Sequence, residues 1–372
     1  MAKNGDEHDE MKQHCSGTSG LWEERGVSRR DFLKFCTAMS AALALPVSLA
    51  PRIAEALESD SRPSVIWLEF QSCTGDTEAL LRAANPTVGE IVLDVLSVDY
   101  AETIMAAAGH QAEEAKHKTI KERRGKYIAV VEGAIPMKDN GVYCCVGGRS
   151  AVDIAREVCG GAMATITVGT CASYGGIPAA SPNPTGAVGV KDAVAGATVI
   201  NLPGCPVNTD NLVATVVHIL TFGKLPATDS KGRPLFAYGK RIHDNCERRP
   251  HFDAGQYVEQ WGDQAHRAGH CLYKMGCKGP ETFHNCPTQR YNEKTNWPVG
   301  SGHGCAGCSE PHFWDTMTPF YRRLPNVPGF GIEATADKIG LGVAVATAAA
   351  FGIHGVVSAL RKGDESDAGK EG

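Results

Sequence analysis

The sequence predicts an α/β protein with a parallel sheet, followed by a smaller irregular region organised by metal. Up to about residue 224, short apolar runs alternate with helical segments, which is the pattern of parallel βαβ units. From residue 225 the apolar periodicity fades, and His, Cys, Gly, Pro and Trp become dense. We therefore expect a sheet domain at 57–224 and a second domain, without a sheet, at 225–334.

Each element of the first domain follows from a local run of residues. The predicted elements are buried strands at 63–70, 89–98, 126–131, 163–170 and 197–202, and helices at 78–84, 149–159 and 209–222. Three of the strands run into a loop that holds a cysteine: Cys73, Cys171 and Cys205. Because ligands gather outside the carboxyl ends of parallel strands, we expect these three thiols to point to one place.

The composition limits the classes of function. The chain has 372 residues, enough for two modest domains, and 42% of them are hydrophobic. A formal charge of −5, without a stripe of Lys and Arg, argues against a nucleic-acid partner. The 14 cysteines favour a metal cofactor, because a disulfide framework is typical of short domains that lack a core.

Residues 1–56 have the pattern of a twin-arginine export leader. The pair Arg29-Arg30 precedes an apolar stretch that ends near residue 50, and residues 54–56 offer a small-x-small cleavage site. This route moves folded proteins, which suits a protein that receives metal cofactors before export. An ordinary basic and apolar helix is the alternative.

Residues 335–362 have the pattern of a transmembrane anchor, and 363–372 of a short tail. The stretch 339–360 contains no Asp, Glu, Lys or Arg, and at about 1.5 Å per residue it is long enough to cross a bilayer core. Arg361 and Lys362 follow, which predicts a C-terminus on the cytoplasmic side and a body outside. A buried amphipathic helix is the alternative.

Soft donors fall into three groups of the kind that hold iron–sulfur clusters. The first is formed by the cysteines after the strands, the second pairs an H-x-x-C motif with two further cysteines, and the third has three thiols, enough for a three-iron cluster. Zinc sites are the alternative, but they predict closed sets of four ligands. The members in order are Cys73, Cys171 and Cys205; His243, Cys246, Cys271 and Cys277; Cys286, Cys305 and Cys308.

These residues lie in long stretches that resemble the small subunit of nickel-iron hydrogenases. The matching stretches are, in order, SCTGDTE, VGTCASYGG, NLPGCPVN, IHDNCERRPHFDAG, CLYKMGCKGPET, NCPTQRYNEKTNWP and GHGCAGCSEPHFWD. They cover about residues 63–330. The leader and the anchor resemble those of the membrane-bound uptake members.

The resemblance implies a flavodoxin-like first domain with a proximal 4Fe-4S cluster, and a second domain with a medial 3Fe-4S and a distal 4Fe-4S cluster. Matching motifs assign the cluster ligands. They are Cys73, Asp76, Cys171 and Cys205 for the proximal cluster, His243, Cys246, Cys271 and Cys277 for the distal cluster, and Cys286, Cys305 and Cys308 for the medial cluster. Pro298 stands where a fourth medial ligand could otherwise lie.

Asp76 departs from the family pattern, which usually reads C-T-G-C-x-E. Here the stretch reads Cys73-Thr74-Gly75-Asp76-Thr77-Glu78, with a carboxyl in place of the second thiol. Three outcomes are open: Asp76 binds iron through an oxygen, the cluster has three protein ligands, or the cluster is missing or poorer in iron. Oxygen is a harder ligand than sulfur, so the potential should differ.

The resemblance also implies a function and partners. A heterodimer would oxidise H2 at a nickel-iron centre in a separate large subunit, and this chain would pass electrons to a membrane cytochrome b and quinone. The resemblance allows a dimer of heterodimers, and we expect the complex on the periplasmic face of the inner membrane. One alternative is an electron-transfer subunit related to those of quinone oxidoreductases, although those subunits lack the block that spans residues 243–308 here. The other alternative is a zinc-stabilised exported anchor protein.

Overall fold

The computed structural model describes residues 28–57, 62–83, 87–323 and 336–368. Its centre is a sheet of five parallel strands in the order β2-β1-β3-β7-β9. Counted along the chain, these strands follow the order 2-1-3-4-5, which is the flavodoxin-like order. The predicted α/β class with a parallel sheet is confirmed. The strands are β1 (Ser64–Glu69), β2 (Ser97–Ala101), β3 (Ile128–Glu132), β7 (Ala164–Val168) and β9 (Val199–Leu202).

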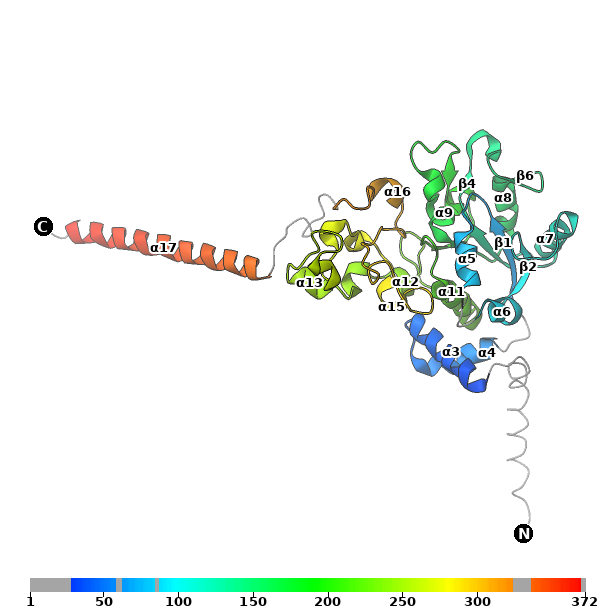
Figure 1. Cartoon of the computed structure of the whole chain (residues 1–372), viewed down its shortest axis with the longest axis horizontal. Coiled ribbons are helices and arrows are strands. Elements are labelled where there is room, and N and C mark those ends of the chain that lie inside the picture. Colours follow the sequence, from blue (N-terminus) through cyan, green and yellow to red (C-terminus); the bar gives the residue numbers. More distant parts are fainter. Residues whose placement is uncertain (1–27, 58–61, 84–86, 324–335, 369–372) are drawn as a thin grey trace, which may run out of the picture.

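The sheet is buried on both faces, as the continuous apolar runs require. Along β3, Ile128 and Val130 belong to one hydrophobic core, while Ala129 and Val131 belong to the other. The first core also takes side chains from α5 (Gly75–Leu81) and α11 (Thr209–Phe222), and the second from α7 (His110–Glu122) and α8 (Ala151–Gly161). Helices therefore cover both faces of the sheet (Figure 1).

The prediction of a strand at 89–98 is wrong for most of its length. The chain there forms α6 (Val88–Glu90) and the π-helical η2 (Ile91–Val95), and β2 begins only at Ser97. A capping box starts this helical segment: the Thr87 side chain accepts from the Glu90 N–H, and the Glu90 carboxylate accepts from the Thr87 N–H. An apolar run of this length does not by itself distinguish a strand from a helix.

Small elements fill the loops of the first domain. Two short antiparallel pairs join β4 to β8 and β5 to β6. Helix α9, which follows β7 directly, carries Cys171. The bounds are β4 (Ile135–Pro136), η3 (Lys138–Gly141), β5 (Cys145–Val146), β6 (Arg149–Ser150), α9 (Gly169–Tyr174), η4 (Ile177–Ala179), β8 (Ala187–Val188) and α10 (Val190–Ala193).

The second domain is irregular, as predicted. Between residues 225 and 323, no element that the structure describes exceeds the five residues of α13 (Arg249–Asp253). A small apolar cluster there includes Cys286, Cys305 and Trp297, so the candidate ligands are themselves part of its interior. The remaining elements are α12 (Leu235–Tyr238), η5 (Ile242–Asn245), α14 (Gln264–Arg267), η6 (Tyr273–Met275), η7 (Gly279–Glu281), α15 (Cys286–Gln289) and α16 (Phe313–Thr316).

The described part of the expected leader folds onto the body. It forms α3 (Arg29–Ala42), η1 (Val47–Leu49) and α4 (Ala50–Leu57), and α3 and α4 lie against α11 (Figure 1). Phe32, Cys36, Met39 and Leu43 form one buried stripe of α3 and join the same core as α11. Residues 1–27 lie outside the described part, and the role of the segment as an export leader stays a prediction.

The predicted anchor at 335–362 falls on the long helix α17 (Ala336–Ala368), which projects from the body (Figure 1). Phe351 and Leu341 on this helix are 73% and 67% exposed. Ala and Gly make up much of its sequence. Across the described ranges, no helix combines the length and the apolarity needed to span a membrane, so the predicted transmembrane helix is not confirmed. Residues 324–335 and 369–372 lie outside the described part.

Candidate metal centres

The first group of predicted ligands gathers at the carboxyl edge of the sheet. Cys73 follows β1, Cys171 lies in α9 directly after β7, and Cys205 follows β9. Burial first, and then the nearby charges of Asp76 and Cys73, raise the pKa of the Cys171 thiol to about 11. Burial and the charges of Cys308, Cys171, Asp76 and Cys73 raise the pKa of Cys205 to about 12. The thiols of Cys171 and Cys205 therefore both respond to the charges of Asp76 and Cys73 at this edge of the sheet.

Asp76 is held in the first turn of α5 with only 8% of its surface exposed. Its Oδ1 accepts a hydrogen bond from the Val207 N–H at 2.6 Å. A Cβ at Gly169, whose φ is +82°, would lie 2.0 Å from Asp76 Oδ2, so only glycine allows this approach. Burial first, and then the charge of Glu132, raise the pKa of the Asp76 carboxyl to about 7. The carboxyl thus sits against the loops that carry Cys171 and Cys205.

Glu132, at the end of β3, orients the turn that carries Asp76. Its carboxylate accepts from the backbone N–H groups of Asp76 at 3.2 Å and Thr77 at 2.8 Å, and from the Thr77 hydroxyl at 2.6 Å. This buried side chain therefore satisfies N–H groups in the first turn of α5. From the sequence, Glu132 is expected to be a capping or a solvated side chain rather than one that moves protons, and the structure shows the capping bonds.

The second group lines one small cavity. His243 in η5, Cys246, Cys271 and Cys277 all border it. Burial first, and then the charge of Arg249, lower the pKa of His243 to about 4, so the imidazole is neutral near pH 7 and able to bind a metal through nitrogen. The Cys246 sulfur accepts from the Arg248 N–H at 3.4 Å, and backbone bonds of this kind stabilise thiolates.

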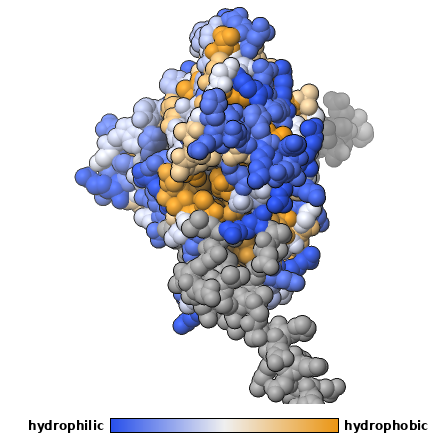
Figure 2. All heavy atoms as spheres, turned by 90° about the vertical axis from the view of Figure 1, so that its right-hand side faces the viewer, coloured by the Kyte–Doolittle hydropathy of each residue, from blue (hydrophilic) through white to orange (hydrophobic). Residues whose placement is uncertain are grey.

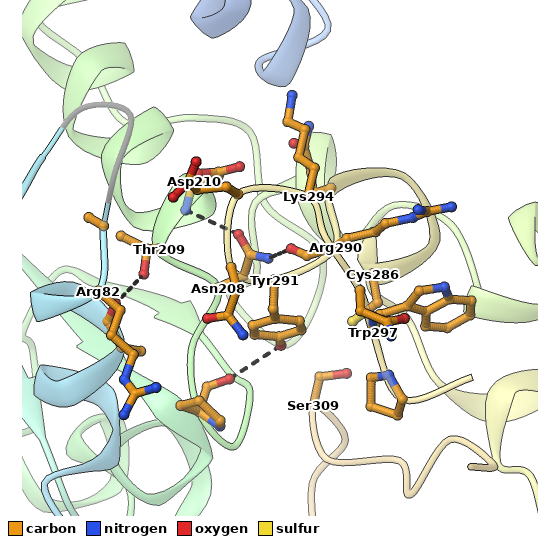
Figure 3. A pocket seen from close by; sticks show the side chains of 18 of the residues that line it. Arg82, Asn208, Thr209, Asp210, Cys286, Arg290, Tyr291, Lys294, Trp297 and Ser309 are labelled. Atoms are coloured by element: carbon orange, nitrogen blue, oxygen red, sulfur yellow. Dashed lines mark hydrogen bonds between the residues drawn. The ribbon is translucent and has the colours of Figure 1, made fainter. Parts of the chain in front are cut away.

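The third group lines a larger cavity of about 1080 Å³, between the two domains. Cys286, Cys305 and Cys308 border it together with Pro298, at the place where a fourth ligand is absent. His284 Nδ1 lies 3.0 Å from the Cys286 sulfur, and burial lowers the pKa of His284 to about 3. Figure 3 views this cavity with Cys286, Trp297 and Ser309 around it.

Backbone groups connect the three candidate sites. The Cys305 N–H donates to the Cys277 sulfur at 3.3 Å, which joins the third group to the second. The Thr170 hydroxyl contacts the Cys308 carbonyl and the Gly204 N–H beside Cys205, which joins the first group to the third. The predicted residues therefore form a continuous series through the protein.

The donor set fits iron–sulfur clusters. None of the cysteines from Cys36 to Cys308 forms a disulfide in the part of the chain that the structure describes. Within that same part, no three His, Cys, Asp or Glu side chains are close enough to share a single metal ion. The backbone N–H bonds to Cys246, Cys277 and Cys305 suit thiolate ligands.

Two residues with a structural part in these sites were missed by the sequence analysis. Thr170 hydrogen-bonds the loops of Cys205 and Cys308, and Asn208 connects the start of α11 to the loop at Arg290 (Figure 3). Thr170 directly precedes Cys171, but a threonine beside a cysteine carries no signal of its partners. Asn208 precedes a predicted helix, which is a capping signal that could have been used.

Comparison with known proteins matches both domains. A family model for the C-terminal part of the NiFe/NiFeSe hydrogenase small subunit matches residues 238–321, and one described as NADH ubiquinone oxidoreductase, 20 Kd subunit, matches residues 73–219. The second match accords with the alternative of a quinone-oxidoreductase-like subunit. The first covers the block that this alternative lacks.

Relatives that match over most of the chain are also hydrogenase small subunits. The chain is 47% identical to the uptake hydrogenase small subunit of Azotobacter vinelandii, over 92% of this chain and 95% of that one. It is 46% identical to the quinone-reactive Ni/Fe-hydrogenase small chain of Wolinella succinogenes, over 93% and 100%. The structure of the Ni-Fe-Se hydrogenase from Desulfomicrobium baculatum matches with a TM-score of 0.67 and 35% identity, over 71% of this chain and 100% of that one. The chain belongs to the family of nickel-iron hydrogenase small subunits and is a component of an oxidoreductase.

Proposed function

We propose that this chain carries electrons from H2, oxidised at the nickel-iron centre of a partner large subunit, through three iron–sulfur clusters to a membrane cytochrome b and quinone. The clusters, when bound, supply single-electron transfer. One observation carries the proposal: three groups of soft donors lie in a connected series, joined by the Thr170 hydroxyl between the Cys205 and Cys308 loops and by the bond from Cys305 to Cys277.

The residues of this chain would hold the clusters as follows. Cys73, Cys171, Cys205 and the Asp76 carboxylate would hold a proximal 4Fe-4S cluster. The medial 3Fe-4S cluster needs only three thiols, and the distal 4Fe-4S cluster would be held partly by a neutral imidazole. The full sets are Cys73, Asp76, Cys171 and Cys205; Cys286, Cys305 and Cys308; His243, Cys246, Cys271 and Cys277.

The chain's own groups do three things in this scheme. Backbone N–H groups donate to the thiolates, which stabilises their charge and raises cluster potentials. Glu132 fixes the turn that aims Asp76. The apolar cluster with Trp297 packs beside Cys286 and Cys305, which lowers the polarity on that side of the third group.

The partners and location are part of the same proposal. Figure 2 shows hydrophobic side chains gathered over a hollowed part of one face, between hydrophilic surfaces, and such a surface favours a protein partner. We take that partner to be a large subunit, in an arrangement that allows a dimer of heterodimers. Export through the Arg29-Arg30 leader would place the complex on the periplasmic face of the inner membrane, and cell fractionation measures this.

Low-temperature EPR with iron and sulfide analysis of the purified complex tests the proposal. We expect about eleven irons on this chain, with a 3Fe signal in the oxidised state and further signals on reduction by H2. Bound zinc without visible absorption would support the zinc alternative. An iron count near eight or below, or an oxidised protein without a 3Fe signal, would contradict the proposal.

A further inference from the structure

Thr170 lies at the junction of three loops that carry predicted ligands. It directly precedes Cys171 in α9, and its side chain is 98% buried, since only 2% of the residue is exposed. Its backbone N–H donates to the Gly204 carbonyl at 2.9 Å, next to Cys205. Its hydroxyl contacts both the Gly204 N–H and the Cys308 carbonyl. One small side chain thus touches the surroundings of two candidate sites.

The surrounding donors and acceptors decide in which contact the Thr170 hydroxyl donates and in which it accepts. A threonine hydroxyl has one hydrogen to donate and lone pairs to accept. The Gly204 carbonyl already accepts the Thr170 backbone N–H, and it lies 3.1 Å from the hydroxyl oxygen. The hydroxyl hydrogen is therefore best used on the Cys308 carbonyl, while the oxygen accepts from the Gly204 N–H at 3.0 Å.

The Cys308 loop is also held from its other side. The Glu310 carboxylate accepts from Arg233 Nη1 at 2.8 Å and from the Phe283 N–H at 2.8 Å. The Ser309 hydroxyl donates to the Phe283 carbonyl at 3.1 Å. These contacts fix the loop to the second domain. The Thr170 hydroxyl bonds the Cys308 backbone directly to the sheet domain, where Cys308 also packs near Tyr174 and Ala179.

We propose that the Thr170 hydroxyl is a positioning group that sets the spacing between the proximal and medial sites, by holding the Cys205 and Cys308 loops in one arrangement. This inference rests on the proposed function. Thr170 acts through the ligands beside it and does not itself bind metal. Removing the hydroxyl leaves the Gly204 N–H and the Cys308 carbonyl buried without this partner, and relaxation of either loop changes both the separation of the sites and the hydrogen bonds to sulfur.

Three variants of the whole complex test the inference. Thr170→Val keeps the shape and removes the hydroxyl, and Thr170→Ser keeps the hydroxyl. Thr215→Val is the matched control, because Thr215 is equally buried but its hydroxyl donates within α11, to the Asn211 carbonyl at 2.7 Å. The measurements are EPR redox titration of the medial cluster, the magnetic coupling between the medial and proximal signals, and amide exchange.

We expect Thr170→Val to shift the medial potential beyond the scatter of replicate titrations, to change the coupling, and to speed amide exchange around residues 204–207. Thr170→Ser should restore all three, and Thr215→Val should leave the potential and coupling as in the wild type. Unchanged potential and coupling in Thr170→Val, or failure of Thr170→Ser to restore them, would overturn the inference.

Two further results keep the test decisive. If Thr170→Val does not assemble, amide exchange of the wild-type complex decides: slow exchange at Gly204 supports the contact, and fast exchange there refutes it. If the wild-type complex itself lacks the three cluster signals, the proposed function fails. If the wild-type complex shows those signals but Thr170→Val has the same medial potential and coupling as the wild type, this inference fails and the proposed function stands.

Discussion

The Asp76 carboxyl replaces a thiol at the candidate proximal site, and its surroundings decide what it can do. It is buried, it accepts the Val207 N–H, and its pKa is raised to about 7 by burial and by the charge of Glu132. Oδ1 accepts the Val207 N–H and Oδ2 lies beside Gly169, so the carboxyl lies next to both ligand loops, and binding of iron by Asp76 stays a prediction. Oxygen in place of sulfur should alter the electronic properties of whatever is bound there.

Asp76→Cys tests this directly. We expect the proximal EPR signal to shift in line shape and potential, because a thiolate donates more charge to iron than a carboxylate does. Asp210→Asn, at the start of α11, is the control for loss of a partly buried carboxyl. If the Asp76→Cys spectrum and potential match those of the wild type, the carboxylate is not a ligand.

Glu102 provides a pH dependence away from the candidate ligands. Burial, and then the charge of Glu69, raise the pKa of Glu102 from 4.5 to about 7, against the opposing charge of Lys116 and bonds from the Glu69 N–H and the Tyr100 hydroxyl. Between these two pKa values the folded state binds a proton that the unfolded state lacks. Stability therefore increases as the pH falls from above 7 toward 4.5.

We expect the free energy of unfolding to be about 1–3 kcal/mol higher near pH 5.5 than near pH 8 on account of this group, and Glu102→Gln to remove that part of the dependence. Denaturant titrations at both pH values measure it. The exposed Glu114→Gln should retain the wild-type dependence. A Glu102→Gln curve parallel to that of the wild type would refute the assignment.

Helix α11 shows how one element serves both domains. It follows the loop of Cys205, and its N-cap Asn208 accepts from the N–H groups of Asp210 at 3.1 Å and Asn211 at 3.4 Å. The Asn208 amide also donates to the Arg290 carbonyl, in the loop after Cys286 (Figure 3). The apolar side chains of α11 complete one hydrophobic core of the sheet domain. The start of α11 is therefore fixed relative to two candidate sites.

Asn208→Ala should destabilise the protein by about 1–2 kcal/mol, because it removes the cap and the bond to Arg290. Asn208→Asp retains the acceptor of the cap and removes only the donor to Arg290. The difference between the two variants in chemical denaturation separates the contributions. Equal losses would mean that the cap contributes nothing.

At the scale of the whole molecule, a buried ion cluster within the second domain connects segments that lie far apart in the sequence. Arg233, in the loop after α11, donates to Glu310 beyond the Cys308 loop, and the two side chains are 3% and 5% exposed. Lys231 donates to the same carboxylate at 2.6 Å. Charges this deeply buried are tolerated because each finds partners, so the loss of one should destabilise the second domain around the Cys308 loop.

Glu310→Ala should destabilise the protein by about 3–5 kcal/mol, because it leaves Arg233 with only part of its compensation. The comparison is Glu78→Ala, which removes a surface pair with Arg82 whose side chains are 55% and 66% exposed, and should cost under about 1 kcal/mol. Thermal unfolding of both variants measures the contrast. Similar losses in the two would refute a stabilising role for the buried cluster.

The sequence alone was sufficient for the parallel sheet, the irregular second domain and the bounds of α11, because these depend on local periodicity and on residue chemistry. The donor residues stay a prediction. It failed at 88–95, where the Thr87 capping box turned an apolar run into helix. It also did not predict α7, since the run HQAEEAKHKTIKE is largely polar and only Ala112, Lys116, Thr119 and Ile120 are buried.

Only the tertiary structure decided which backbone groups face the candidate ligands. The contacts of Thr170 with Cys308, of Glu132 with Asp76 and of Cys305 with Cys277 join residues that lie 138, 56 and 28 positions apart. Local sequence carries information about neighbours in the chain. Long-range hydrogen bonds are set when the strands and loops pack, so their partners emerge only with the fold.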